Sequence, residues 1–125
     1  MTRISDRFLQ LAVLAALTGM GLGIGMGITD NFQLQAVHAH VNLLGWVSMM
    51  LYGLFYRVVP KAAVGLLPAV HFWLTLISFV VMMTLLTAVK LGANALAMPL
   101  GLISLGMVLA MALFAMIVFR ATWKP

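Results

Sequence analysis

The scarcity and placement of charged residues constrain this chain more than any other feature. Seven of its 125 residues are Lys or Arg and two are Asp or Glu. These charges separate four uncharged segments, each long enough to cross a bilayer, since a membrane-spanning helix needs about 20 apolar residues. Soluble domains carry about a quarter charged residues, whereas this chain carries 7% and is 65% hydrophobic. The sequence therefore predicts an integral membrane protein and excludes a soluble globular domain.

The apolar segments predict an all-α fold in which four transmembrane helices form a single domain over 1–125. The helices are expected at about 8–28, 33–57, 64–88 and 94–119, joined by turns too short to hold an extramembrane domain. Basic residues favour the cytoplasmic side of a membrane. We therefore expect both termini and the second connection to be cytoplasmic, in the cell's inner membrane. Six cations lie in these regions: Arg3, Arg7, Arg57, Lys61, Arg120 and Lys124.

The same composition excludes several classes of partner and cofactor. The cations are dispersed and form no stripe along which a phosphate backbone could lie, so nucleic acid is not an expected partner despite the basic balance. The chain has no cysteine. This excludes a disulfide framework, a thiolate metal site, an iron–sulfur cluster and the covalent attachment of a c-type haem.

Two histidines near the outer end of the second helix are the main candidate site residues. Ionisable residues inside a membrane are functional-site candidates by default. His38 and His40 are two positions apart and so point about 200° apart on a helix. They cannot hold one ion from the same side. Two interpretations stay open from the residues alone: interhelical hydrogen bonds, or ligation of a haem or metal, for which imidazole is a usual ligand.

The residues that follow each histidine predict different surroundings for the two. The face of His38 continues with polar or small residues and is predicted to point into the protein: Asn42, Gly45, Met49, Tyr52 and Tyr56. The face of His40 is uniformly apolar and is predicted to meet lipid or another subunit: Leu43, Leu44, Val47, Leu51 and Leu54.

Alternating glycines in the first helix lie at the predicted depth of these histidines. They form two strips with the small-xxx-small spacing that allows close helix contact in lipid: Gly19, Gly23 and Gly27, and on the other side Gly21 and Gly25. Both strips can serve tight helix contacts. Alternatively, one strip makes room for a flat cofactor, in which case Gly21 and Gly25 are candidate haem-packing residues together with Trp46.

The remaining histidine and the methionines point less directly to a site. His71 lies near the cytoplasmic start of the third helix, far in depth from His38, and is expected to be a hydrogen-bonded core residue. Eleven methionines make copper conceivable because thioethers prefer Cu(I). They are scattered over all four segments, however, and methionine commonly fills apolar interiors, so copper is not favoured.

Two motifs resemble the catalytic subunit of haem-copper oxidases, most closely the cbb-type oxidases and nitric oxide reductases. The segment from His38 to Pro60, HAHVNLLGWVSMMLYGLFYRVVP, is similar to the family's tenth helix, with its H-x-H, G-W and G-x-x-Y-x-x-x-P elements. The segment 71–74, HFWL, resembles the opening of the next helix. Val41 and Asn42 stand where the family commonly has small residues. The match covers about a third of the chain.

The resemblance implies that His38 and His40 are axial ligands, and hence iron ligands, of haem groups on opposite sides of one helix. It also implies that the chain corresponds to one four-helix arc of the family's twelve-helix core. We therefore expect a homo-oligomer, with a trimer favoured, in which His38 of one subunit and His40 of its neighbour hold haem b. A redox partner or quinol would complete the electron path.

Three functions follow from these expectations. The first is a membrane b-type haem protein with an electron-transfer or haem-linked redox role. The second is an oligomeric haem enzyme of the terminal oxidase or nitric oxide reductase type, although no catalytic residue can be named and a single chain lacks the family's copper ligands. The third is an assembly or interaction subunit without a cofactor.

Overall fold

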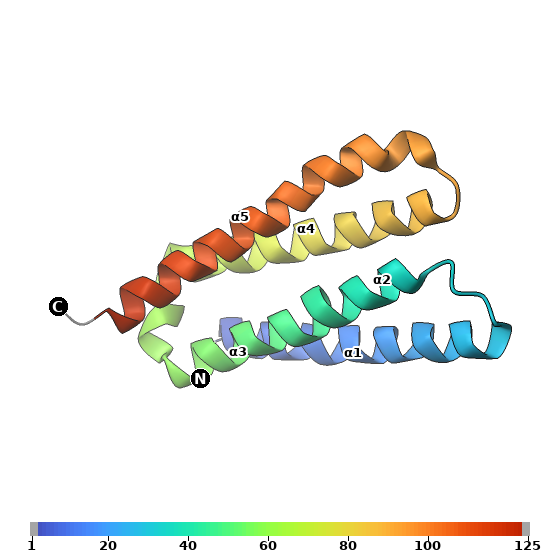
Figure 1. Cartoon of the computed structure of the whole chain (residues 1–125). Coiled ribbons are helices and arrows are strands. Elements are labelled where there is room, and N and C mark those ends of the chain that lie inside the picture. The colour runs from blue at the N-terminus through green and yellow to red at the C-terminus, as the bar shows by residue number, and fades with distance from the viewer. Residues whose placement is uncertain (1–2, 124–125) are drawn as a thin grey trace.

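The computed structural model describes residues 3–123, and within this range the chain folds into four long helical stretches (Figure 1). Lys124, one of the cations expected to be cytoplasmic, lies outside the described residues. The stretches are α1 (Arg3–Thr29), a continuous run of α2 (Gln35–His40), η1 (Val41–Ser48) and α3 (Met49–Val58), then α4 (Leu66–Lys90) and α5 (Ala97–Thr122). Two short 3₁₀ turns, η2 (Pro60–Ala63) and η3 (Asn94–Leu96), lie in the connections.

These bounds confirm the all-α fold and the order of the four predicted helices. Within residues 3–123, three helices are long and apolar enough to cross a membrane, namely α1, α4 and the stretch from Asn94 to Thr122. The second helical run is of comparable length but is interrupted by η1, which is a π-helix. The sequence did not predict this π segment.

The glycine-rich part of α1 stays helical through Thr29 even though glycine is a poor helix former. In water each interior glycine costs about 1 kcal/mol relative to alanine. In lipid no water can satisfy an opened backbone group, so a helix is the only way to pair every N–H and C=O within one segment. The apolar environment predicted from the sequence explains why alternating glycines do not break α1.

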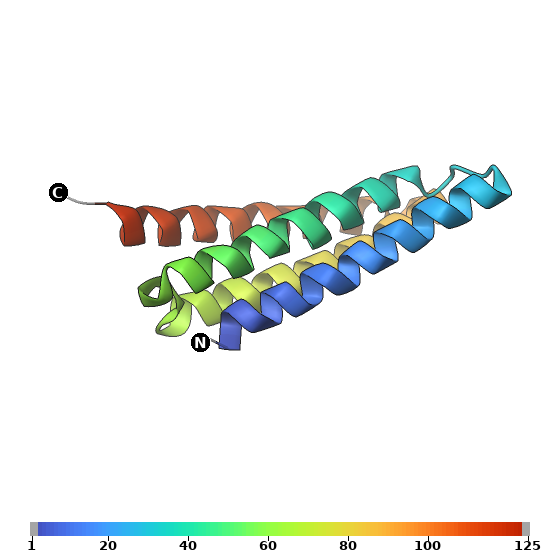
Figure 2. The same ribbon diagram turned by 90° about the horizontal axis from the view of Figure 1, so that it is seen from below.

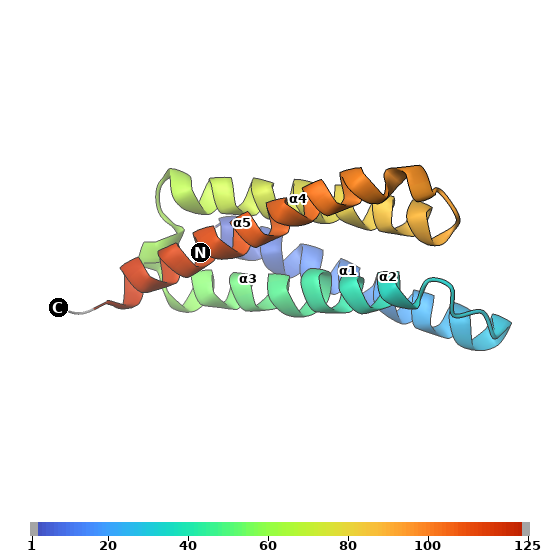
Figure 3. The same ribbon diagram turned by 45° about the horizontal axis from the view of Figure 1, so that its top comes forward.

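The helices form two antiparallel hairpins (Figures 1 and 3). One hairpin joins α1 to the α2–η1–α3 run, and the other joins α4 to α5. Both ends of the chain lie at the end of the bundle that also holds the connection 59–65, which we call the terminal end. The connections 30–34 and 91–96 lie at the opposite, far end. Seen from below, the bundle is elongated and the last turns of α5 extend away from the other helices (Figure 2).

Two buried clusters join the hairpins along the length of the bundle. The terminal-end cluster is largely aromatic and takes residues from all four stretches: Phe8, Ala12, Met49, Tyr52, Tyr56, Phe72 and Ile117. The far-end cluster is aliphatic and rich in methionine: Ala15, Val37, Val41, Met82, Met83, Leu86 and Met107. The methionines of this cluster fill the interior, as expected for scattered methionines.

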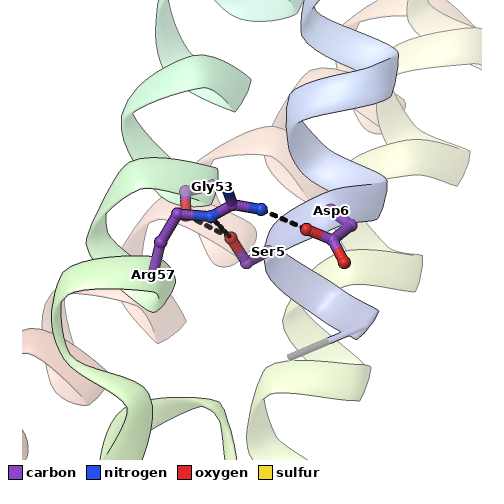
Figure 4. A network of polar contacts seen from close by, with 4 residues as sticks. All are labelled: Ser5, Asp6, Gly53 and Arg57. Atoms are coloured by element: carbon purple, nitrogen blue, oxygen red, sulfur yellow. Dashed lines mark hydrogen bonds and ion pairs between the residues drawn. The ribbon is translucent and has the colours of Figure 1, made fainter. Parts of the chain in front are cut away.

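Polar contacts fasten α1 to α3 at the terminal end (Figure 4). The buried Ser5 hydroxyl donates to the carbonyl of Gly53 at 2.9 Å, and Nε of Arg57 donates to the same hydroxyl oxygen at 3.3 Å. Arg57 also forms an ion pair with Asp6. A Cβ at Gly53 would lie 2.8 Å from Cγ of Leu9, so glycine is required for the two helices to approach this closely. These contacts fix the register of the first hairpin.

A single side-chain contact ties the two far-end connections together. Nε2 of Gln33 donates to the carbonyl of Lys90 at 2.8 Å, which satisfies one of the acceptors left open at the end of a helix. Beyond Lys90 the chain turns at Gly92, where φ is +109°, a conformation that glycine adopts without strain. The hydrogen bond from Gln33 joins the two far-end connections in addition to the packing of the far-end cluster.

Candidate functional site

His38 points from α2 towards α1, as its polar stripe predicted. Its Nδ1–H donates to the carbonyl of Gly19 at 2.8 Å, and its side chain is half-buried. A Cβ at Gly23 would lie only 2.9 Å from Cε1 of His38. The imidazole therefore occupies space that two glycines leave open, which matches the interpretation of His38 as an interhelical hydrogen-bonding residue.

Asn42 completes the surroundings of His38 from one turn further along the helix. Its amide Nδ2 is 3.3 Å from Nε2 of His38 and can donate to it. A Cβ at Gly19 would clash with Oδ1 of Asn42, so this side chain also depends on the glycine strip. Asn42 was not among the predicted site residues, although its i+4 spacing from His38 was the signal that could have identified it.

His40 lies on the opposite side of the helix and faces away from α1. Its Nδ1–H donates to the carbonyl of Ala36, one turn earlier, at 2.7 Å. Three residues on the same face, Leu43, Val47 and Leu51, are 62%, 42% and 58% exposed. His40 itself and Leu44 of the same face are half-buried, and Leu44 packs against the far-end cluster. The face is therefore open only in part, and its contact with lipid or another subunit stays a prediction.

The hydrogen bonds of the two histidines define which ring nitrogen is available to a metal. A carbonyl only accepts hydrogen bonds, so in both imidazoles Nδ1 carries the proton and Nε2 carries the lone pair. Ligating histidines characteristically donate their other N–H in this way, which fixes the tautomer and the orientation of the ring. Nε2 of His40 has no partner among the described residues, whereas that of His38 faces the amide of Asn42.

His40 thus fits an axial haem ligand as it stands, and His38 fits only if Asn42 releases its Nε2. A bare metal ion is a different case, since it needs several protein ligands. Among residues 3–123 no three His, Cys, Asp or Glu side chains gather closely enough to hold such an ion. A haem iron takes only its axial ligands from side chains, so the arrangement is more suitable for haem than for a bare metal.

The other predicted haem-packing residues lie away from the histidines. Within the described part of the chain, nothing lies within 4 Å of a Cβ placed at Gly21 or Gly25. Both glycines instead border a groove of about 510 Å³ that also involves Leu22, Met26 and Leu91. Trp46 packs against the terminal-end cluster. The structure therefore does not bring these residues together with either imidazole.

Only part of the glycine pattern makes tight helix contacts. Gly19 and Gly23 do so through Asn42 and His38, whereas positions 21, 25 and 27 are open among the described residues. Within residues 3–123, tight helix contacts are therefore made by Gly19 and Gly23 and not by the Gly21–Gly25 strip. One strip faces the partner helix of the hairpin, and the other has no helix opposite it.

His71 on α4 is buried at the terminal end, among aromatic rings. It is 0% exposed, and its Nδ1 is hydrogen-bonded to the hydroxyl of Tyr56 at 2.9 Å. The rings of Phe8, Tyr52 and Phe114 have centroids 4.7–5.2 Å from that of His71. The expectation of a hydrogen-bonded core histidine is confirmed.

Two buried polar atoms near this pair lack a protein partner within residues 3–123, namely Nε2 of His71 and the hydroxyl of Thr75. Most other hydroxyls on these helices donate to a carbonyl one turn earlier, as Thr84 does to Val80 and Thr87 to Met83. Thr75 makes no such bond. Because His71 and Thr75 are four positions apart, both unpaired atoms lie on one face of α4.

The two histidine regions lie at different depths in the bundle. Tyr56, the partner of His71, follows His38 by 18 positions on one continuous helical run, which corresponds to about 27 Å along the axis. His71 therefore cannot share a ligand with His38 or His40.

Comparison with known proteins gave no match: no protein-family model, no curated protein and no solved structure is similar to this chain at a significant level.

Proposed function

We propose that the chain is a membrane b-type haem-binding protein with an electron-transfer or haem-linked redox role, assembled as a homo-oligomer with a trimer favoured. The observation that carries the proposal is the geometry of His40. Its Nδ1–H is held by the carbonyl of Ala36 at 2.7 Å. Nε2 is left without a partner among the described residues, on a face where Leu43, Val47 and Leu51 are exposed.

The residues around His40 suit a site between subunits. A haem held there would supply one-electron reduction and oxidation at its iron. Leu43 and Val47 would pack against the ring system and exclude water from it, since both are apolar and exposed on the same face. The hydrogen bond to Ala36 fixes the plane of the imidazole, which keeps Nε2 in one orientation.

A second axial ligand would come from His38 of a neighbouring copy. This requires the amide of Asn42, 3.3 Å from Nε2 of His38, to turn away. The ring would also have to move relative to Gly23. Closed rings are an accessible solution for head-to-tail contacts between identical chains, and the resemblance to one arc of a twelve-helix core favours three copies.

The proposed topology places both termini in the cytoplasm and the chain in the cell's inner membrane. The terminal end holds both ends of the chain and the connection 59–65, and five described cations lie there: Arg3, Arg7, Arg57, Lys61 and Arg120. The far-end connections carry Asp30 and Lys90. This asymmetry supports the orientation through the positive-inside rule.

The test is the absorption spectrum and the native mass of protein purified from its own membrane. We expect a Soret band, a mass of three chains with haem, and no change of the reduced spectrum with carbon monoxide. A shift with carbon monoxide would indicate an open haem position and favour the oxygen- or nitric-oxide-reducing enzyme. Absence of a Soret band would favour the assembly subunit without cofactor, and a haem-loaded monomer would overturn the trimer.

A further inference from the structure

A cleft of about 250 Å³ opens at the terminal end, between η2, the start of α4 and the end of α5. Lys61 and Arg120 line it from two different elements, and both are exposed. Its apolar wall includes Leu67, Pro68 and Ile117. Two cations thus border a hollow that lies beside the apolar surface of the helices.

The two cations have no acidic partner in the described part of the chain. The sequence contains only two carboxylate side chains, Asp6 and Asp30. Asp6 is paired with Arg57, and Asp30 lies in the connection at the far end. No carboxylate side chain of residues 3–123 therefore compensates the charge of Lys61 and Arg120, and this charge favours an anionic ligand.

The surface next to the cleft is apolar and aromatic. Arg120 also borders a hollow of about 410 Å³ with Phe119 and Trp123, whose side chains are 64% and 74% exposed. Tryptophan is enriched where membrane proteins meet the lipid headgroups. A ligand at this place meets positive charge at one end and apolar surface along its length.

The start of α4 contributes a further feature that suits an anion. The N-cap residue is Gly65, which has no side chain with which to cap the helix. The first N–H groups of a helix have no intrahelical partner. Pro68 has no N–H, so the open donors here are those of Leu66 and Leu67, and no side-chain cap serves them among the described residues. These groups face the same end of the bundle as Lys61.

We propose that this cleft binds the headgroup of an anionic phospholipid. Lys61 and Arg120 contact the phosphate oxygens, Trp123 lies at the level of the headgroup, and Leu67 and Ile117 of the apolar wall lie alongside the acyl chains. Basic pockets between membrane helices are suited to such headgroups. The proposal concerns the opposite end of the bundle from His40 and does not depend on haem binding.

The test is lipid retention by protein reconstituted in nanodiscs that contain equal amounts of phosphatidylglycerol and phosphatidylcholine. After release into detergent, native mass spectrometry counts the lipids that remain bound. We expect phosphatidylglycerol to be retained in preference. The preference should fall about fivefold for each charge removed, in Lys61→Gln, in Arg120→Gln and further in the double variant.

Lys90→Gln is the matched control, because it removes one exposed cation from the far end and should leave the preference unchanged. All these side chains are exposed, so the variants should melt at the temperature of the parent protein. Equal retention of the two lipids by the parent, or an unchanged preference in the double variant, would overturn the proposal. Displacement of phosphatidylglycerol by millimolar inorganic phosphate would also overturn it, since the cleft would then recognise a free anion rather than a lipid.

Discussion

Both ends of the bundle contain histidine side chains, but the surroundings of these side chains differ. At the terminal end, aromatic side chains of the same chain enclose His71, which is 0% exposed and bonded to Tyr56. At the far end, His40 is half-buried and hydrogen-bonds only within its own helix, on a face where Leu43, Val47 and Leu51 are exposed. A histidine enclosed by its own chain stabilises the fold, whereas one on a partly open face remains available to a ligand.

The strongest test of this difference is His40→Ala. We expect loss of nearly all Soret absorption per folded protein, at least tenfold, because removing a residue that only hydrogen-bonds to a metal ligand already costs about 10- to 100-fold in metal affinity. His38→Ala should also reduce haem retention severely if His38 supplies the second axial position. The helical circular dichroism should stay that of the parent protein, because the His40 ring hydrogen-bonds only within its own helix. Undiminished haem in His40→Ala would refute the proposed ligand.

The reciprocal change is His71→Ala at the terminal end. It opens a cavity and leaves the Tyr56 hydroxyl without its partner, so we expect the free energy of unfolding to fall by about 2–4 kcal/mol. Haem per folded protein should stay the same. The measurement is denaturant unfolding in detergent, followed by helical circular dichroism. Loss of haem at unchanged stability would indicate that the haem site lies at the terminal end, near His71, and would contradict the proposal.

Removal of the hydroxyl in Tyr56→Phe isolates one bond of the enclosed pair. The aromatic ring and its packing remain, so the expected loss is about 1 kcal/mol, plus the cost of a second unpaired nitrogen on His71. The variant should be less stable than the parent and more stable than His71→Ala. A stability equal to that of the parent would show that the 2.9 Å contact contributes nothing.

Two glycine substitutions, one in each strip of α1, compare the strip that contacts the neighbouring helix with the strip that does not. Gly23→Ala places a Cβ 2.9 Å from the His38 ring, whereas Gly25→Ala meets nothing within 4 Å among the described residues. We expect Gly23→Ala to destabilise by about 1 kcal/mol and Gly25→Ala to stabilise by up to about 1 kcal/mol, because alanine is the better helix former. Equal effects in thermal unfolding would contradict the assignment of one contact strip and one open strip.

The smallest expected effect belongs to Thr75→Val. The hydroxyl of Thr75 is buried without a protein partner, so replacing it by a methyl group should be neutral or stabilise by up to about 1 kcal/mol. Thr84→Val is the control, since it removes a bond to the carbonyl of Val80. A clear destabilisation by Thr75→Val alone would reveal a hydrogen-bonding partner of that hydroxyl beyond the chain itself.

The coarse fold could be predicted because charge placement limits where a membrane helix can end. The predicted 8–28 and 64–88 lie within the observed Arg3–Thr29 and within two residues of Leu66–Lys90. The burial of Tyr52 and the exposure of Leu51 also followed from helical spacing. Helical periodicity determines which residues share a helix face, and the scarcity of charged residues indicates that the helices lie in a membrane.

Some details of the site depend on contacts between helices, and these contacts cannot be predicted from the helical periodicity of the sequence. The opposite directions of His38 and His40 were predicted correctly. The i+4 spacing places Asn42 next to His38 on one helix face. It could not indicate that Tyr56 would be the partner of His71, because that contact depends on how two helices are rotated against each other. Haem binding, trimer formation and membrane orientation remain predictions.

The π segment Val41–Ser48 lies between α2, which carries His40, and α3, which carries Tyr56. It therefore affects how far one end of this helical run is rotated about the axis relative to the other. A π turn is closed by i→i+5 bonds and takes up one residue more than an α turn. Deleting one residue within it would turn His40 by about 100° around the axis relative to Tyr56. An insertion or deletion, rather than a substitution, is thus the kind of mutation that could redirect the imidazole of His40 while the enclosed end stays as it is.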